Sequence, residues 1–134
     1  MSTVSHIGIA VEDLEKSIKL FTQILGCDPV SIEEVAEQKV KVAIFRPGGE
    51  KTTAIELVCP VSDSSPIKKY LEKRGQGLHH ISIKTDDIKE KLDSLKSKNF
   101  KLIDQLPRQG ADGKKIAFVH PSSTSGVLLE LEQD

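Results

Sequence analysis

Apolar and polar residues alternate at the start of the chain, and the spacing then becomes helical. Residues 4–11 alternate in the manner of a half-buried strand. Asp13 is the predicted N-cap of a helix, and Gly26 is its predicted stop. The apolar stripe of this helix consists of Leu14, Ile18, Phe21 and Leu25. Further strands are predicted at 29–35, 39–45 and 52–58.

The second half of the chain predicts the same order of elements. A strand at 78–85 is followed by a helix at about 87–98. Strands are then expected at 101–104, 115–119 and 127–131. Between the halves, Ser65 and Pro66 predict the start of a short helix, because serine is a good N-cap and proline is favoured at the first helical position.

Three separated stretches of the first half recur in the second half with one common offset. HIGI starts at His6 and HISI starts at His80, 74 positions later. VAIFRP and IAFVHP share this offset, and so do AIELV and LLELE, which place Glu56 opposite Glu130. One register shared by three stretches indicates an internal duplication.

The duplication predicts an α+β fold for the chain. We expect one domain over residues 1–134, made of two βαβββ modules at about 4–59 and 77–132. One helix covers only one face of a four-stranded module. Two modules side by side are therefore expected to form one curved mixed sheet, with the helices outside and a concave inner face for binding.

Strand alternation predicts which side chains reach that inner face. The apolar residues of each first strand must pack under the helix, so His6 and His80 point the other way, and His79 points to the helix side or its edge. In the last strands, Glu56 and Glu130 lie between apolar residues that point to the helix side. A pseudo-two-fold axis would bring two histidines and two glutamates together.

Two imidazoles and two carboxylates are a common ligand set for a divalent metal ion. A half-buried glutamate is costly unless it is paired or bound to a cation. Taken singly, a strand histidine is more often structural and a buried glutamate is often salt-bridged. Because His6, Glu56, His80 and Glu130 all obey one offset, the pattern favours a metal site.

Composition and charge exclude several classes of partner. The 134 residues carry 19 basic and 20 acidic side chains, and no basic run is interleaved with aromatic residues, which argues against a nucleic acid partner. The first residues lack the basic start and long apolar core of a signal peptide, and no apolar stretch is long enough to span a membrane. We therefore expect a cytoplasmic protein with no membrane partner.

Four stretches of the chain resemble the methylmalonyl-CoA epimerases: HIGIAVEDLEKSIKLF, EEVAEQKVKVAIF, SPIKKYLEKRGQGLHHISI and FVHPSSTSGVLLELEQ. A duplicated βαβββ module with one ligand in each first and last strand is also similar to the vicinal oxygen chelate superfamily, which includes glyoxalase I. The resemblance runs almost from end to end. It implies the glyoxalase-like fold and an isomerase that interconverts (R)- and (S)-methylmalonyl-CoA as a homodimer.

The resemblance also implies a metal-dependent site. It places the metal ligands on His6, His80 and Glu130, with Glu56 where the family has a glutamate or glutamine. The ion would be divalent, with cobalt first and zinc, manganese or nickel as alternatives. Glu130 and Glu56 are the candidate acid–base groups, because inversion at C2 needs a proton donor and acceptor on opposite faces. In some members of the family, a carboxylate from the third strand of the first module acts as a base. The corresponding stretch here presents Gln38, Lys39 and Lys41 and no carboxylate.

Two other functions fit the same sequence. A glyoxalase-I-like enzyme, or another metal-dependent member of the superfamily, would use the same four ligands. An extradiol dioxygenase fits less well, because such iron sites favour two histidines and one carboxylate. A small-molecule-sequestering binding protein is an alternative of a different class, and it would not need both histidines and both glutamates.

Overall fold

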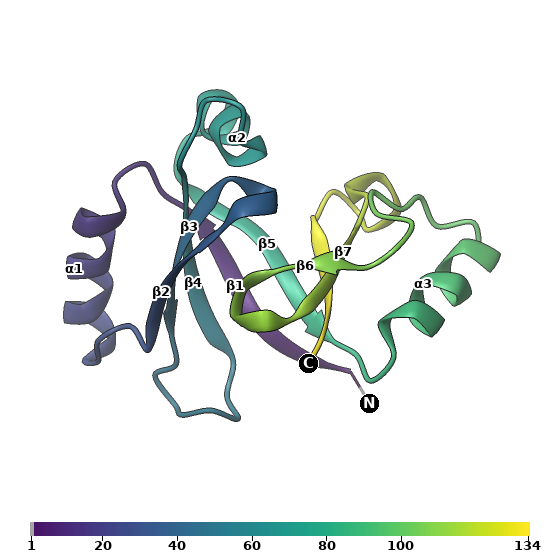
Figure 1. Cartoon of the computed structure of the whole chain (residues 1–134), viewed down its shortest axis with the longest axis horizontal. Coiled ribbons are helices and arrows are strands. Elements are labelled where there is room, and N and C mark those ends of the chain that lie inside the picture. Colours follow the sequence, from purple (N-terminus) through teal and green to yellow (C-terminus); the bar gives the residue numbers. More distant parts are fainter. Residues whose placement is uncertain (1) are drawn as a thin grey trace. The chain divides into compact units, whose positions relative to one another are not determined.

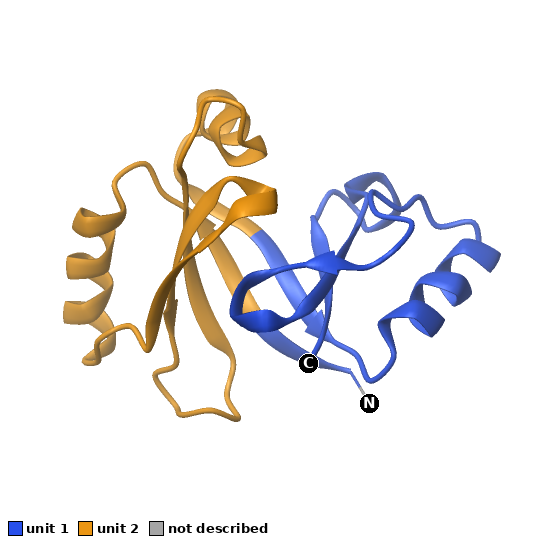
Figure 2. Cartoon of the chain, in the orientation of Figure 1, with its two compact units in different colours: residues 1–5, 80–134 blue, residues 6–79 orange. Residues whose placement is uncertain are grey.

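The structure is a computed structural model that describes residues 2–134. Its eight strands belong to one mixed sheet, and three α-helices pack on the strands (Figure 1). The chain divides into two compact units, one of residues 6–79 and one that joins the N-terminal residues to 80–134 (Figure 2). Strand order and helix placement repeat in the two units, which confirms the predicted α+β class and the double use of the βαβββ order.

In the unit of residues 6–79, the strand order is β2-β3-β4-β1. Strands β1 and β4 are parallel, whereas β3 is antiparallel to both β2 and β4. The elements of this unit are β1 (Thr3–Ala10, which begins in the other unit), α1 (Leu14–Leu25), β2 (Ser31–Val35), β3 (Val40–Phe45), β4 (Ala54–Pro60) and α2 (Pro66–Arg74).

Helix α1 begins and ends where its caps predict. Asp13 accepts a hydrogen bond from the backbone N–H of Lys16, and Gly26 ends the helix in the left-handed conformation at φ 72°. The predicted stripe of α1 packs against β3 and β4 (Figure 1). Burying that face stabilises the unit, and its core contains Val11, Ala43, Phe45 and Leu57, with Ile18 and Phe21 packed against them.

Helix α2 is the short helix expected between the modules. Ser65 caps it by accepting from Ile67 N–H, and Pro66 is its first residue. Ile67 and Leu71 are buried, and the helix packs against β4. Ser65 also donates a hydrogen bond to the carbonyl oxygen of Gln38 at 3.2 Å, which ties the start of α2 to the turn before β3.

In the other unit, the strand order is β5-β8-β7-β6. Strands β5 and β8 are parallel, and β7 is antiparallel to both β8 and β6. Asp87 caps α3 by accepting from Glu90 N–H, and the buried face of α3 packs with β7 and β8. The elements are β5 (Gly77–Lys84, which begins in the first unit), α3 (Ile88–Ser97), β6 (Arg108–Gln109), β7 (Lys115–Val119) and β8 (Leu129–Gln133).

The predicted strand at 101–104 was wrong. Only Leu102 in this stretch forms an isolated antiparallel bridge, to Val119. The side chain of Asp104 accepts the backbone N–H of Phe118 at 2.8 Å, so a carboxylate takes a donor that a strand carbonyl would otherwise have paired. The partner strand of β7 on this side is β6, which contains only two residues.

Two other strands are shifted from their predicted positions. The strand expected at 52–58 is β4, Ala54–Pro60, and the strand expected at 127–131 is β8, Leu129–Gln133. Before β8, Ser125 and Gly126 have positive φ angles of 57° and 89°, and they extend the turn up to the start of the strand. The apolar Val127 therefore lies in the turn and is 43% exposed.

Candidate metal site

The unit of residues 6–79 contains a buried histidine–glutamate pair. Gly8 of β1 lies opposite Glu56 of the parallel strand β4, and His6 lies one inward-facing position before Gly8. The neighbours of Glu56 on β4, Ile55 and Leu57, pack in the core under α1, so the carboxylate points to the other face. His6 Nδ1 and Glu56 Oε2 are 3.2 Å apart, and both residues are buried.

The unit that contains residues 80–134 holds the equivalent pair. Ser82 of β5 lies opposite Glu130 of the parallel strand β8, and His80 precedes Ser82 on the same face. His80 Nε2 and Glu130 Oε2 are 3.8 Å apart, and both residues are buried. Each pair therefore uses the first and last strands of a module, as the offset of 74 predicts.

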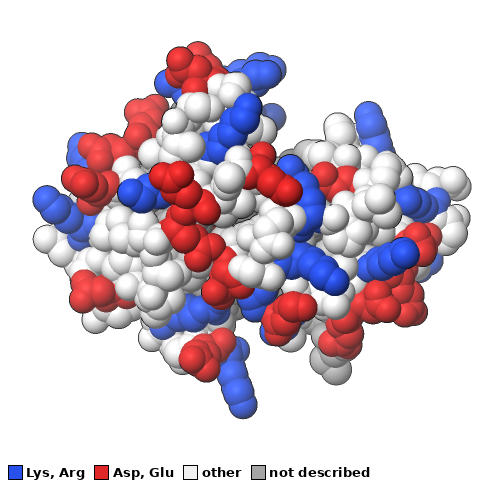
Figure 3. Space-filling view, viewed as in Figure 1, with Lys and Arg blue, Asp and Glu red and all other residues white. Residues whose placement is uncertain are grey.

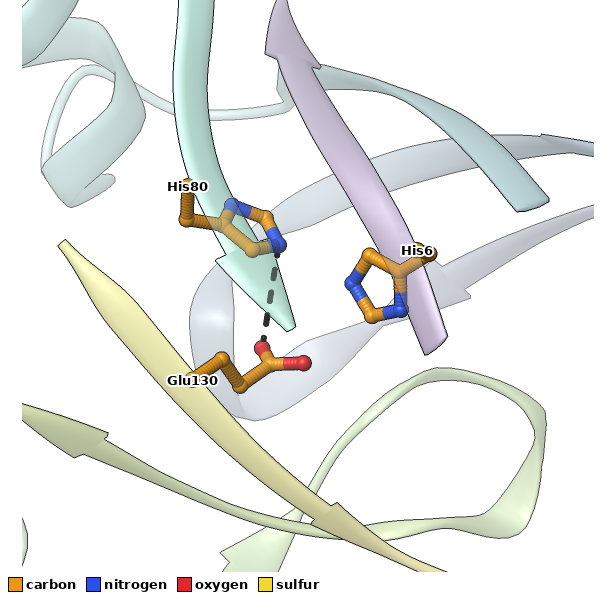
Figure 4. Close-up of side chains that lie close together, drawn as sticks. All are labelled: His6, His80 and Glu130. Atoms are coloured by element: carbon orange, nitrogen blue, oxygen red, sulfur yellow. Dashed lines mark ion pairs between the residues drawn. The ribbon is translucent and has the colours of Figure 1, made fainter. Parts of the chain in front are cut away.

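Three of the four predicted ligands offer ligand atoms that lie close together. His6, His80 and Glu130 each present one such atom, and these atoms lie within 4.8 Å of one another (Figure 4). Among residues 2–134, the group contains only these three residues, and Glu56 joins it through its contact with His6.

The chemistry of this donor set fits a divalent cation. Glu130 is 4% exposed, and a buried carboxylate loses several kcal/mol of hydration unless a cation or hydrogen-bond donors compensate. Imidazole nitrogens and carboxylate oxygens together suit zinc, cobalt, manganese and nickel. The residues present therefore fit the metal ion that the sequence predicted.

His79, the neighbour of His80, lies on the opposite face of β5. Its ring packs edge-on against Tyr70 of α2, with the ring centroids 4.7 Å apart. Burial lowers the pKa of His79 to about 4, because desolvation disfavours the charged imidazolium. His79 is therefore neutral at pH 7 and supports packing, which agrees with its predicted direction.

Sequence reasoning missed an aromatic ring beside the candidate ligands. Phe118 of β7 lies directly opposite Glu130, and its ring meets the His80 ring edge-on with a centroid distance of 5.8 Å. The signal was present, because the alternation of β7 points Phe118 and Ile116 to one face and Ala117 and Val119 to the core under α3. An aromatic ring packed on a ligand imidazole helps to fix its orientation.

Glu132 is a further buried glutamate on the face of Glu130, and sequence reasoning did not single it out. Glu132 is 5% exposed and follows Glu130 by two positions on β8, so both carboxylates point the same way. The hydroxyl of Ser5 donates to Glu132 Oε2. His120 accepts the backbone N–H of Ser122 on its Nδ1 at 3.0 Å and caps the turn after β7.

The distribution of surface charge agrees with the balanced composition. Acidic and basic side chains are interspersed over the face shown in Figure 3. Within residues 2–134, no helix combines the length and the apolar character that crossing a membrane requires.

Comparison with known proteins defines the class first. A family model described as Glyoxalase/Bleomycin resistance protein/Dioxygenase superfamily matches residues 5–118. The match covers nearly all of the first module and most of the second. The chain therefore belongs to this superfamily, as the duplicated module and its ligand pattern predicted.

Individual relatives define the family within this class. A mitochondrial methylmalonyl-CoA epimerase of Dictyostelium discoideum is 37% identical, over 97% of this chain and 77% of that protein. An ethylmalonyl-CoA/methylmalonyl-CoA epimerase of Cereibacter sphaeroides is 34% identical, over 97% and 96% of the two chains. An uncharacterized protein of Bacillus subtilis, YqjC, is 45% identical, over 98% and 91%. The chain belongs to the methylmalonyl-CoA epimerase family, which is a family of isomerases.

Solved structures agree with this assignment. The methylmalonyl-CoA epimerase of Mycobacterium tuberculosis superposes with a TM-score of 0.91 at 32% identity, covering 97% of this chain and 86% of that one. A methylmalonyl-CoA epimerase in complex with methylmalonyl-CoA and NH4+ superposes with a TM-score of 0.94 at 29% identity, covering 100% and 95%. The glyoxalase-like fold that the sequence predicted is confirmed.

Proposed function

We propose that the protein is a metal-dependent methylmalonyl-CoA epimerase that interconverts the (R) and (S) forms by exchanging the proton at C2. The observation that carries the proposal is the convergence of buried ligand atoms from His6, His80 and Glu130 within 4.8 Å. The family membership and the acyl-CoA complex of a structural neighbour support the choice of substrate.

In this proposal, His6, His80 and Glu130 hold a divalent ion, and Glu56 completes the set. His6 Nδ1 and Glu56 Oε2 are 3.2 Å apart, so Glu56 would lie close enough to help hold an ion bound by His6. The bound ion would supply positive charge beside the thioester and carboxylate oxygens of the substrate.

The chain's own contribution is proton transfer and exclusion of water. The C2 proton is acidified by the thioester and the carboxylate that flank it. One carboxylate removes this proton from one face, and a second group returns a proton to the opposite face, which inverts the centre. Glu130 and Glu56 come from different modules, and we assign these two roles to them. Burial keeps both carboxylates away from bulk water, where competing proton transfer would occur.

Isotope exchange in heavy water tests the proposal. The protein, freed of metal and then given cobalt, should incorporate deuterium at C2 of methylmalonyl-CoA, and the metal-free protein should not. Glu130→Gln and Glu56→Gln should each lower the rate of exchange from one stereoisomer by at least about 100-fold, because general acid–base catalysis contributes about 10²–10⁴-fold. Glu34→Gln, an exposed carboxylate on β2, is the matched control and should exchange normally.

Metal binding gives an independent reading of the same site. His80→Ala should lose cobalt, whereas His79→Gln, the adjacent histidine on the other face, should keep it. A glutathione hemithioacetal assay run in parallel separates this enzyme from a glyoxalase. Turnover of the hemithioacetal without exchange at C2 of methylmalonyl-CoA would contradict the proposed substrate, and tight ligand binding without either reaction would indicate a sequestering protein.

We also propose that the protein is a cytoplasmic homodimer. The resemblance of the chain to the epimerases supports the dimer. Sedimentation equilibrium of the purified protein measures the first, and cell fractionation measures the second.

A further inference from the structure

A cationic side chain is held over an aromatic ring in the unit that contains residues 80–134. The guanidinium carbon of Arg108 lies 5.6 Å from the centre of the Phe118 ring. Arg108 Nε lies 3.2 Å from Asp104 Oδ1, while Asp104 Oδ2 accepts the backbone N–H of Phe118 at 2.8 Å. One carboxylate therefore fixes both the arginine and the strand that carries the ring.

Strand register places Arg108 on the face of the candidate ligands. Arg108 lies opposite Ile116, which lies opposite Glu132, and Phe118 lies opposite Glu130. Residues that are directly opposite on paired strands project to the same side of a sheet. Because the Phe118 ring also meets the ring of His80, a single aromatic ring lies between the guanidinium and this candidate ligand.

The way in which Arg108 is held leaves hydrogen-bond donors for a ligand. Asp104 lies beside Nε, at the inner edge of the guanidinium, and the side chain of Arg108 is 36% exposed. A guanidinium has five N–H donors in a planar fork, and this fork binds a carboxylate through two parallel hydrogen bonds. A purely structural arginine on β6 would need only the contact with Asp104.

We propose that Arg108 binds the free carboxylate of the acyl group and so selects malonyl-type thioesters over uncharged acyl-CoA thioesters. The inference rests on the proposed function and adds a specificity-determining residue to it. The carboxylate belongs to the reacting end of the substrate, next to the candidate ligands, whereas the pantetheine arm carries the CoA phosphates away from this end. The anion that Arg108 binds beside the candidate ligands is therefore the acyl carboxylate and not a phosphate of CoA.

Calorimetric binding to the cobalt-loaded protein tests the assignment with two ligands that differ in this carboxylate. Arg108→Gln should weaken the binding of methylmalonyl-CoA by about 10–100-fold, because hydrogen bonds to charged groups contribute about 1.5–3 kcal/mol. The same substitution should change the affinity for propionyl-CoA less than about 2-fold. Arg108→Lys keeps the positive charge but loses the planar fork of donors, so it should weaken the binding of methylmalonyl-CoA by about 5-fold or more.

Lys115→Gln is the matched control. Lys115 is an exposed cation on β7, and strand alternation points it away from the face of Ile116 and Phe118. Its replacement should leave both affinities unchanged. Metal content and thermal unfolding are measured for every variant, and if Arg108→Gln does not fold, Arg108→Lys provides the reading.

Three results would overturn the assignment. Equal loss of both ligands in Arg108→Gln would place the arginine against the CoA portion, no loss in either arginine variant would remove it from the site, and a wild type without preference for methylmalonyl-CoA would remove the selectivity. These readings need no turnover. Absence of exchange at C2 in the wild type would instead contradict the proposed function. The binding comparison would still decide the role of Arg108.

Discussion

His6 Nδ1 lies 3.2 Å from Glu56 Oε2 across the parallel strands β1 and β4, and the pair is repeated 74 positions later. In the second pair, His80 Nε2 lies 3.8 Å from Glu130 Oε2 across β5 and β8. Each module thus carries one buried imidazole and one buried carboxylate on adjacent strands. A duplicated module gives both halves of the site the same backbone frame, and this frame determines the direction of all four side chains.

The first prediction concerns Glu56 and its partner His6. Glu56→Gln keeps the shape of the side chain but removes its negative charge, so we expect cobalt affinity to fall by about 10–100-fold, as for groups that hold or orient a metal ligand. Competition with a chelator of known affinity measures the change. Glu34→Gln controls for the loss of one charge, and an equal cobalt affinity in the two variants would contradict a role for Glu56.

The second prediction concerns His79 and pH. The folded protein lowers the pKa of His79 to about 4 from an ordinary value of 6.5, because burial disfavours the imidazolium. Between pH 6.5 and 4 the unfolded chain therefore binds a proton that the folded chain does not. The free energy of unfolding should be unaffected by His79 above pH 6.5 and should fall as the pH drops from 6.5 to 4.

Urea unfolding of His79→Phe measures this contribution. The variant lacks the titrating group, so the difference in unfolding free energy between variant and wild type should shift in favour of the variant by roughly 1–2 kcal/mol between pH 7.5 and 4. The expected shift is smaller than the full pKa difference implies, since the ring is partly exposed. A difference that stays constant over this pH range would show that His79 titrates normally.

The third prediction concerns the core under α1. Leu57 is 0% exposed and packs in the cluster beneath the helix. Leu57→Ala should lower the free energy of unfolding by about 2–5 kcal/mol, since it removes buried methyl groups and leaves a cavity. Leu78 is 71% exposed, and Leu78→Ala should change the free energy of unfolding by less than about 0.5 kcal/mol. Equal effects of the two substitutions in urea unfolding would refute this account of the core.

The fourth prediction concerns a close approach near β6. A Cβ atom on Gly110 would lie 2.7 Å from Ile116 Cγ2, and Ile116 is 2% exposed. Because the χ1 angle of a β-branched residue is stiff, Gly110→Ala should destabilise the protein by about 1–3 kcal/mol. Gly110→Ala with Ile116→Ala should cost less than the sum of the two single changes. Strict additivity in thermal unfolding would place the strain elsewhere.

Much of the fold could be predicted because local signals and the repeat agree. The caps Asp13, Gly26 and Ser65 marked helix ends that the structure confirms. The stretch from 101 to 109 could not be predicted in this way. There Asp104 pairs with the backbone of Phe118 in place of a strand carbonyl, and a contact between residues 14 positions apart leaves no periodic signal in the sequence.

Strand alternation predicted part of the candidate site, namely the directions of its side chains. Alternation gave the directions of His6, His80, Glu56 and Glu130, and it separated His79 from His80. It did not give the distances, so the contact of Glu56 with His6 came only from the structure. Arg108 was beyond its reach, because a strand of two residues has no measurable period and its direction follows only from the pairing with β7.

The paired registers make the face of the candidate ligands sensitive to changes in chain length. Deleting one residue inside β8, before Glu130, would shift the register so that this carboxylate points to the face under α3. A leucine would then point to the face of the candidate ligands, although the composition would hardly change. The hairpin between β3 and β4 is under no such restriction, because residues 46–53 carry none of the candidate ligands. Natural variation in length should therefore collect in that hairpin, while strands of fixed length preserve the chemistry.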